Sequence, residues 1–153
     1  MERTLVILKP SAVARGLIGE VISRFERKGL QLVGLKLACL SDEVLNEHYA
    51  HLANRPFFGQ IKESMQATPV VLCCWQGLEA VRIVRDMTGA TNGRSAAVGT
   101  IRGDLSLSTQ ENIVHTSDSV ENAAVEVARF FRPDELFDYE HPLKAFVYAN
   151  DEL

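Results

Sequence analysis

The chain has 153 residues, a length that suits one domain and leaves little room for two. Its net charge of −4 argues against a nucleic-acid-binding surface. A nucleotide site is still possible, because charges beyond about 8 Å are largely screened. No apolar run approaches the roughly 20 residues that span a bilayer, and the first residues lack the pattern of a signal peptide. We therefore expect a single domain over residues 1–153, located in the cytoplasm.

The three cysteines agree with a reducing compartment. Cys73 and Cys74 are neighbours in an apolar run, and adjacent residues of a strand point to opposite faces, so they are poorly placed to bridge each other. Together with Cys39 they show no metal-ligand spacing. We expect all three to be reduced, buried thiols.

The first elements follow from the hydrophobic pattern. Residues 4–8 form a nearly continuous apolar run, which is typical of a buried central strand. Apolar residues from Ile18 to Phe25 recur at helical spacing, which predicts a helix over residues 17–28 with Gly29 as its natural end. Residues 30–40 alternate well enough to predict a second strand.

Two short helices, over residues 41–49 and from residues 56–58 onward, are expected before a third strand over residues 69–75. A further helix is expected to begin at Gly77 and to end before Gly89. Residues 89–111 show no hydrophobic periodicity, and a connection of that length in a compact domain is usually functional or disordered. Because this segment is rich in turn formers and in phosphate-binding residue types, we favour a functional loop.

The last strand is predicted over residues 112–116, and the clearest helix of the chain follows it. Asp118 is expected to head that helix, with Glu121 as its capping-box partner. Glu126 lies about 100° from the centre of the apolar stripe, at 100° per residue, so that its side chain can reach past the helix. The stripe itself consists of Val120, Ala123, Ala124, Val127, Phe130 and Phe131.

This order of elements predicts an α+β fold on the ferredoxin-like βαββαβ plan. We expect a four-stranded antiparallel sheet with helices covering one face. The long loop would lie between the helix that follows the third strand and the last strand.

No Walker loop and no dinucleotide fingerprint occurs, so a phosphate site would have to be built without the common loops. Polar residues instead lie at strand ends and in loops, and each alone is more often structural. On that interpretation, Lys9 is a solvated lysine at a strand end and His115 a hydrogen-bonded structural residue. Arg85 would lie on the surface, and Tyr49 and Phe57 would serve in packing. Thr91 and Asn112 would be turn or cap residues. His48 and His51 have no third metal ligand nearby, and we expect them on an exposed helix face.

Taken together, these residues carry a specific resemblance. The pattern runs in order through Lys9-Pro10, Arg55-Pro56-Phe57-Phe58, Gly89-Ala90-Thr91-Asn92, Gly99-Thr100-Ile101-Arg102-Gly103-Asp104 and Asn112-Ile113-Val114-His115-Thr116-Ser117-Asp118-Ser119. In these motifs, and over essentially its whole length, the chain closely resembles nucleoside diphosphate kinase.

The resemblance implies that His115 carries phosphate as a phosphohistidine, on its pros nitrogen, from a nucleoside triphosphate (mainly ATP) to a nucleoside diphosphate by a ping-pong mechanism. It also implies the other roles. Phosphate oxygens would be held by Lys9, Arg85, Arg102 and the Thr91 hydroxyl, and the sugar hydroxyls by Asn112 and Lys9. Phe57 would stack on the base, and Tyr49 would support the phosphate and histidine region. Glu126, assisted by Ser117, would orient the imidazole.

General chemistry agrees with these roles. Imidazole has a reference pKa near 6.5, so a free lone pair is available at neutral pH, and phosphoryl transfer needs mainly positioning and charge stabilisation. Mg²⁺ would bridge the nucleotide's own phosphates, so no protein ligand to the metal is expected. The family also implies a homo-oligomer, a hexamer or a tetramer, with no nucleic-acid or membrane partner.

Some positions depart from the family pattern. Thr116 follows His115 where the family usually has a small residue, and a β-branched side chain stiffens the backbone there. Gly93 and Val98 stand where prolines are common in the long loop. Two alternatives to an active kinase therefore stay open: an inactive relative that binds nucleotides or acts as a scaffold, and a ferredoxin-like binding module without chemistry.

Overall fold

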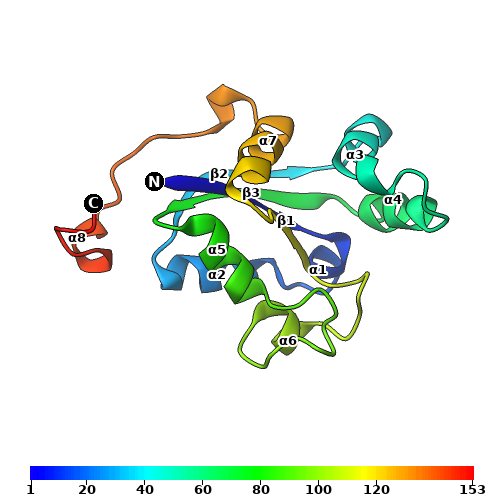
Figure 1. The fold of residues 1–153 in the computed structure, drawn as a ribbon, viewed down its shortest axis with the longest axis horizontal. Helices are drawn as coiled ribbons and strands as arrows, with labels where there is room; N and C mark the ends of the chain where they lie inside the picture. The colour runs from blue at the N-terminus through cyan, green and yellow to red at the C-terminus, as the bar shows by residue number, and fades with distance from the viewer.

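The computed structural model describes residues 1–153 and contains a four-stranded antiparallel sheet between two layers of helices (Figure 1). The strands are β1 (Glu2–Leu8), β2 (Gln31–Ala38), β3 (Val70–Gly77) and β4 (Val114–Thr116), in the spatial order β2-β3-β1-β4. The expected ferredoxin-like α+β plan is confirmed, with two additional helices between β2 and β3.

The helices follow the hydrophobic pattern closely. None of them is long and apolar enough to cross a membrane. They are α1 (Pro10–Ala14), α2 (Ile18–Lys28), α3 (Asp42–His48), α4 (Phe58–Gln66), α5 (Ala80–Thr88), α6 (Ile101–Leu105), α7 (Val120–Phe130) and α8 (Lys144–Val147), with 3-10 turns at Ala50–Leu52 and Pro133–Glu135.

The expectation that helices cover only one face of the sheet was wrong. Helices α2, α5 and α6 pack on one face, and α3, α4 and α7 on the other (Figure 1). The reason lies in β1 and β3, which are apolar on both sides. Val6 and Leu8 of β1 belong to the first core, and Leu5 and Ile7 to the second. A strand that is buried on both faces needs a helical layer on each.

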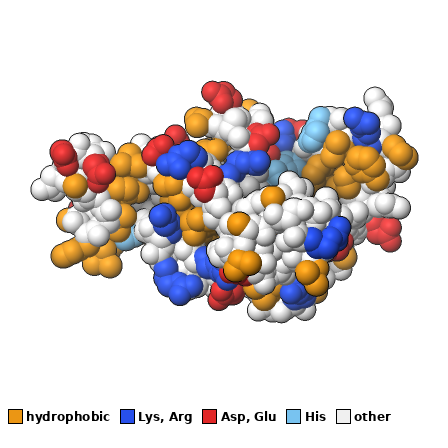
Figure 2. Space-filling model, turned by 60° about the horizontal axis from the view of Figure 1, so that its bottom comes forward, with side chains coloured by type: hydrophobic (Ala, Val, Ile, Leu, Met, Phe, Trp, Pro, Cys, Tyr) orange, Lys and Arg blue, Asp and Glu red, His pale blue; other side chains and the backbone are white.

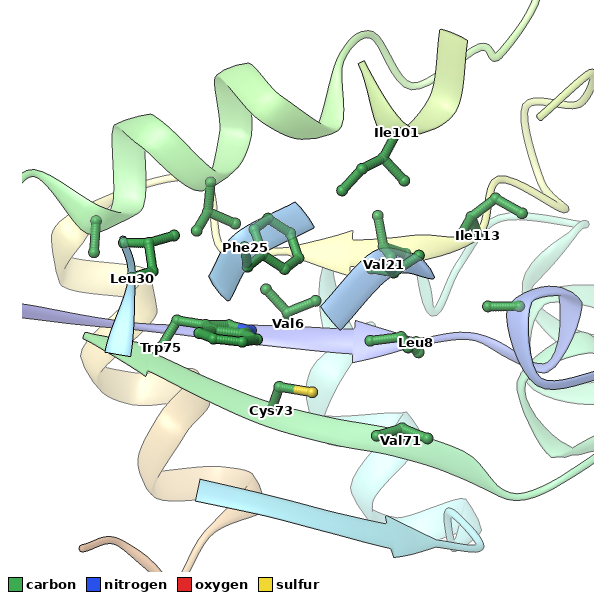
Figure 3. Packing of buried hydrophobic residues seen from close by; sticks show 14 residues of the cluster. Val6, Leu8, Val21, Phe25, Leu30, Val71, Cys73, Trp75, Ile101 and Ile113 are labelled. Carbon is green, nitrogen blue, oxygen red and sulfur yellow. The ribbon is translucent and has the colours of Figure 1, made fainter. Parts of the chain in front are cut away.

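The first core centres on an aromatic pair between α2 and β3. The rings of Phe25 and Trp75 are 5.4 Å apart between centroids, and both side chains are completely buried (Figure 3). Val6 and Leu8 of β1 lie beside them in the same layer (Figure 3). Full burial of each such side chain contributes about 1.5–3 kcal/mol, so β1, and with it the position of Lys9, is firmly fixed.

The cysteines divide between three environments. Cys73 lies in the first core and Cys74 in the second, which confirms that they point to opposite faces of β3. All three thiols are free. The expectation that Cys39 is buried was wrong: it directly follows the last residue of β2 and is exposed, because the sheet no longer covers it.

Two helix starts differ from the sequence-based expectation. Helix α5 begins at Ala80 rather than Gly77, because β3 continues to Gly77, which pairs with Glu2 of β1. Asp118 does not cap α7. The hydroxyl of Ser119 caps it, accepting a hydrogen bond of 3.1 Å from the backbone N–H of Asn122.

The apolar stripe of α7 faces two surroundings. Its members Ala123, Val127 and Phe130 are buried, whereas Val120 is 51% exposed and was wrongly expected to lie inward. Val120 instead lines a surface groove, together with Ala124, Ala128, Phe131 and Leu136 among others. The apolar stripe of α7 therefore extends beyond the part of the helix that is buried against the sheet.

Residues 89–111 form an ordered loop around α6, whose five residues are too few to show a helical period. Asp104 accepts a hydrogen bond of 2.8 Å from the N–H of Gly99 and pairs with Arg24 of α2 at 2.9 Å. The N–H of Gly93 donates to the carbonyl of Ser108 at 3.1 Å, a bond that a proline could not make. Hydrogen bonds and an ion pair thus order this loop where the family commonly has prolines.

The C-terminal segment extends away from the sheet and ends in α8, at the left in Figure 1. Hydrophobic side chains gather at this end of the molecule in Figure 2, and Leu143 and Phe146 are exposed there. The Tyr148 hydroxyl accepts a hydrogen bond of 3.2 Å from the N–H of Leu78, which ties the segment to the edge of the fold. This segment lies far from the loop around α6 (Figure 1).

Gly103 and Gly59 offer a matched test of the close packing in the loop, since both lie inside helices. A Cβ at Gly103 would stand 1.9 Å from the carbonyl oxygen of Ala97, whereas a Cβ at Gly59 would meet nothing within 4 Å. We expect Gly103→Ala to destabilise the protein by about 1–3 kcal/mol through overpacking, and to lower Tm by several degrees. Gly59→Ala should instead stabilise it by about 0.5–1 kcal/mol. Equal shifts of Tm in calorimetry would contradict this account.

Candidate active site

A cleft of about 610 Å³ opens beyond the C-terminal end of β1, between α3, α7 and the long loop. It gathers residues from distant parts of the sequence, and eight of the ten predicted site residues line it. These eight are Lys9, Tyr49, Arg85, Thr91, Arg102, Asn112, His115 and Glu126. The two others, Phe57 and Ser117, do not line the cleft.

His115 lies in the middle of β4, opposite Ile7 of β1. Its Nε2 is 3.0 Å from Oε1 and 3.1 Å from Oε2 of Glu126, which reaches over from α7. A carboxylate only accepts hydrogen bonds, so the ring proton belongs on Nε2. Nδ1, the pros nitrogen, is then left with its lone pair.

The carboxylate of Glu126 is itself fixed by a second donor. The hydroxyl of Ser117, which is completely buried, donates to its Oε1 at 2.6 Å. Burial raises the pKa of Glu126, but the hydrogen bond and positive charge of His115, followed by the hydrogen bond from Ser117, outweigh burial and lower the pKa to about 2. Glu126 is thus an anion over the whole physiological range.

Arg102, in α6, is buried and donates to three backbone carbonyls. Its Nε bonds to Asn112 at 3.2 Å, Nη1 to Gly89 at 3.1 Å and Nη2 to Val114 at 2.7 Å. A guanidinium has five N–H donors, so two stay free for another acceptor. Burial, and then the charge of Arg85, lowers the pKa of Arg102 to about 10, which keeps it cationic at neutral pH.

Lys9, at the end of β1, starts a chain of hydrogen bonds across the cleft. Its Nζ donates to Oδ1 of Asn112 at 2.7 Å, and Nδ2 of Asn112 donates to the carbonyl of Thr91 at 2.9 Å. Burial, and then the charge of Arg102, lowers the pKa of Lys9 to about 8, although Glu111 acts in the opposite direction. Lys9 is therefore a cation at neutral pH, although its pKa lies only slightly above neutral.

The backbone between Asn112 and Val114 turns sharply just before the histidine strand. Ile113 has a φ of 76°, and the N–H of Val114 donates to the carbonyl of Asn112 at 2.8 Å, which closes a γ-turn. A β-branched residue with positive φ is strained, at a cost of about 1–3 kcal/mol. Ile113 is completely buried, and this packing holds the turn that places Asn112 and His115 on the same cleft.

The remaining lining residues differ in exposure. Arg85 and Thr91 are exposed at the mouth of the cleft. Tyr49 is half-buried, and burial, followed by the charge of Glu126, raises its pKa to about 12, so its phenol stays protonated. Phe57 immediately precedes α4 with its side chain 42% exposed.

Thr116 leaves the histidine site intact. It lies in β4, opposite Val6, and is buried. β-Branched residues suit strands, and the neighbouring His115 keeps both of its contacts with Glu126. The departure from a small residue therefore does not disturb the carboxylate–imidazole pair.

Sequence reasoning missed His48. It was expected on an exposed helix face, but only 6% of the residue is exposed, and its ring lies edge-on to that of His115 with centroids 4.5 Å apart. His51 is exposed, as expected. The spacing from the buried Leu45, three residues earlier on α3, could have indicated that His48 points inward.

Sequence reasoning also missed Arg129, three residues after Glu126 on α7. Its Nη1 donates to Nδ1 of His48 at 2.9 Å. His48, His115 and Glu126 offer ligand atoms within 4.8 Å of one another, but the guanidinium directed at Nδ1 of His48 opposes a second cation there. We therefore interpret this group as a hydrogen-bond network rather than a metal centre.

An imidazole held by a carboxylate, in a cleft that is also lined by cations, has the features of an enzyme that transfers phosphoryl groups. A model of the family described as nucleoside diphosphate kinase matches residues 2–136. The chain belongs to the nucleoside diphosphate kinase family, and it transfers phosphate between nucleotides.

Individual relatives agree over the full length. The nucleoside diphosphate kinase of Parabacteroides distasonis is 60% identical over the whole of both chains. Human nucleoside diphosphate kinase 3 is 49% identical over 96% of this chain and 87% of the relative. Among solved structures, the nucleoside diphosphate kinase of Halobacterium salinarum in complex with CDP has a TM-score of 0.93 and 42% identity, over 96% of this chain and 98% of that one.

The pKa of Lys9 lies close to neutral pH, and this predicts how the activity depends on pH. The lysine is cationic below its pKa of about 8 and neutral above it, so one positive charge leaves the cleft as the pH rises through this value. We expect kcat/KM for a nucleoside triphosphate to fall on the alkaline side with a limb near pH 8, in steady-state assays across pH. Lys9→Arg should move that limb to higher pH, because guanidinium stays protonated. A flat profile up to pH 9.5 in the native enzyme would contradict the assignment.

Proposed function

We propose that His115 is the nucleophile of a two-step phosphoryl transfer between nucleotides. The observation that carries this proposal is the carboxylate of Glu126, 3.0 Å from Nε2, which leaves Nδ1 with its lone pair. Nδ1 attacks the terminal phosphorus of a nucleoside triphosphate, the bond to the bridging oxygen breaks, and the nucleoside diphosphate leaves. A terminal phosphate oxygen of a second diphosphate then takes the phosphoryl group from Nδ1 and restores the histidine.

The cations of the cleft would stabilise the charge on the transferred group. Lys9 is half-buried and Arg102 is buried, and their hydrogen bonds hold them in place before substrate arrives. Arg102 keeps two N–H donors for phosphate oxygens. Arg85 and the hydroxyl of Thr91, at the mouth of the cleft, would complete the phosphate site, and the protonated Tyr49 would donate beside the histidine.

The nucleoside would lie toward the outer part of the cleft. The exposed ring of Phe57 would stack on the base, an interaction that tolerates any base. Asn112 has one amide N–H that is not used by Thr91, and with Lys9 it would bind the sugar hydroxyls. ATP is the expected main donor, and other nucleoside di- and triphosphates are expected as substrates.

Mg²⁺ is the cofactor that we infer. The cleft fits a metal that arrives with the nucleotide, because the carboxylate beside His115, Glu126, already accepts from His115 and Ser117 and is not free to hold a cation. The β- and γ-phosphates would hold the ion, with no direct protein ligand. When bound, the metal supplies positive charge that offsets the charge of the phosphate oxygens.

We also infer a homo-oligomer in the cytoplasm, with residues 1–153 acting as one domain. β2 is an edge strand whose Leu35 and Leu37 are 52% and 63% exposed, and an exposed apolar edge favours pairing with another copy. The three free cysteines suit a reducing compartment. We expect no stable nucleic-acid or membrane partner.

The nucleophile is tested by labelling. We expect the protein to take up label from ATP labelled in its terminal phosphate, in acid-labile and base-stable form, and to release it when a nucleoside diphosphate is added. His115→Ala should abolish the label, whereas His141→Ala, which alters a histidine outside the cleft, should keep it. Label that survives His115→Ala would overturn the proposal. An unlabelled native protein would favour an inactive, nucleotide-binding relative, and label that cannot be discharged would reduce the activity to autophosphorylation.

The assembly is tested by mass. We expect sedimentation of the native chain to give a hexamer or a tetramer, and the double variant Leu35→Glu/Leu37→Glu to give smaller species, because like charges would meet where two β2 edges pair. A monomeric mass for the native chain at micromolar concentration would contradict the inference.

A further inference from the structure

Behind the catalytic histidine, a second imidazole is held by an arginine. His48 lies at the end of α3 with 2% of its side chain exposed, and its Nδ1 is 2.9 Å from Nη1 of Arg129 on α7. Only 13% of the Arg129 side chain is exposed. Arg129 makes no hydrogen bond to the phosphate-binding cations or to His115, so its one hydrogen bond to the histidine site is with His48.

The direction of this hydrogen bond determines the protonation of His48. A guanidinium carries donors only and stays charged at all physiological pH values. Nδ1 of His48 must therefore accept, and the ring proton belongs on Nε2. As long as the bond to Arg129 is in place, His48 is neutral and cannot donate from Nδ1.

Without that bond, Nδ1 of His48 would have a different partner. It lies 3.7 Å from Oε2 of Glu126, the oxygen that also faces Nε2 of His115 at 3.1 Å. A proton on Nδ1 of His48 would compete with His115 for this carboxylate. The two imidazole rings also lie close together, with centroids 4.5 Å apart.

We propose that Arg129 is a positioning residue: by donating to Nδ1 of His48 it keeps the ring proton of this imidazole on Nε2, and so reserves the carboxylate of Glu126 for His115 and Ser117. The proposal rests on the proposed function, in which Glu126 orients the nucleophile. It adds a residue that acts two contacts away from the reacting nitrogen.

The groups around His48 favour its neutral form, with one exception. Burial is the largest cause that lowers the pKa of His48, to about 3, and the charges of His115 on β4, Arg129 on α7 and His51 in the following 3-10 turn lower it further. Glu126 is the exception and raises it. Phe130 and Tyr49 cover the rest of the ring edge-on, at 5.1 and 4.8 Å between centroids. Removing Arg129 would leave Glu126 as the nearest charged group to Nδ1.

The anchoring of Arg129 indicates that its contact with His48 is specific. Its Nε lies 3.2 Å from Oε1 of Glu47, but the Glu47 side chain is 64% exposed and Nε makes no hydrogen bond of good geometry. An ion pair with an exposed partner contributes only about 0–1 kcal/mol. The buried hydrogen bond to His48 is therefore the stronger reason for the position of the guanidinium.

The experiment compares Arg129→Met with the native enzyme by two measurements. Methionine keeps an unbranched chain of similar length but has neither charge nor donor. In the native enzyme, nitrogen-15 imidazole spectra should show His48 as the neutral Nε2–H tautomer, without titration down to pH 5.5. In the variant, burial should still keep His48 neutral, but part of the population should carry the ring proton on Nδ1. That proton competes for Glu126, so kcat/KM at pH 7.5 should fall roughly tenfold.

Three further variants make the test specific. Arg129→Lys, which keeps a charge and donors, should restore much of the activity. Arg132→Met, which removes an arginine that is 72% exposed and paired only with Asp134 and Glu135, should leave both measurements unchanged. In the double variant His48→Phe/Arg129→Met, position 48 has no donor that can compete for Glu126, so the loss caused by Arg129→Met should disappear relative to His48→Phe alone.

The proposal is overturned if the His48 spectrum and kcat/KM are the same in Arg129→Met and in the native enzyme. It is also overturned if the loss caused by Arg129→Met persists in the double variant. A native enzyme that forms no label on His115 would instead count against the proposed function, and the His48 spectra would still show whether Arg129 sets the protonation of that ring.

Discussion

The hydrogen bond between Nε2 of His115 and the carboxylate of Glu126 is the interaction on which the site depends. It joins the short strand β4, which pairs with β1, to α7, whose Val127 and Phe130 belong to the core on one face of the sheet. That core exists because Leu5 and Ile7 of β1 are apolar on this side, while Val6 and Leu8 fill the other core. The double burial of β1 thus places the nucleophile, its carboxylate and Lys9 relative to one another.

A site for polyanionic substrates in a protein of net charge −4 must concentrate its cations locally. The fold does so by hydrogen bonding rather than by charge density. Lys9 is held by the side chain of Asn112, and Arg102 by three backbone carbonyls. The strained turn at Ile113 directs two of these carbonyls toward Arg102. Cations fixed in this way need little reorganisation when a phosphate arrives.

Sequence patterns predicted the elements that have a period and the residues that belong to motifs. The doubly buried strands, α2 and the reach of Glu126 from the margin of α7 follow from spacing alone. The continuous apolar runs of β1 and β3 indicate burial on both faces, and the second helical layer was missed because the ferredoxin-like plan was taken to cover one face only. The N-cap of α7 was also not predicted correctly. Ser119 and Asp118 are both favourable N-cap residues, and the structure shows that Ser119 accepts the hydrogen bond from the N–H of Asn122.

The site was predicted from family motifs, and the residues outside those motifs were missed for a physical reason. His48 and Arg129 matter through each other, and their contact joins two helices that are 81 residues apart in the sequence. Taken alone, a helical histidine and a helical arginine each have an ordinary surface interpretation. Only packing of α3 against the same core as α7 brings them together behind His115.

Arg102 shows how support of the loop and binding of phosphate are combined in one side chain. Its three backbone acceptors lie at Gly89, where the long loop begins, and at Asn112 and Val114, where it ends. The guanidinium therefore joins the two ends of the loop, and the residue also lines the cleft. A lysine could supply the charge but not the three directed bonds. Ordering of the loop and charge in the phosphate site thus depend on the same group, whereas the exposed Arg85 contributes charge without a structural role of this kind.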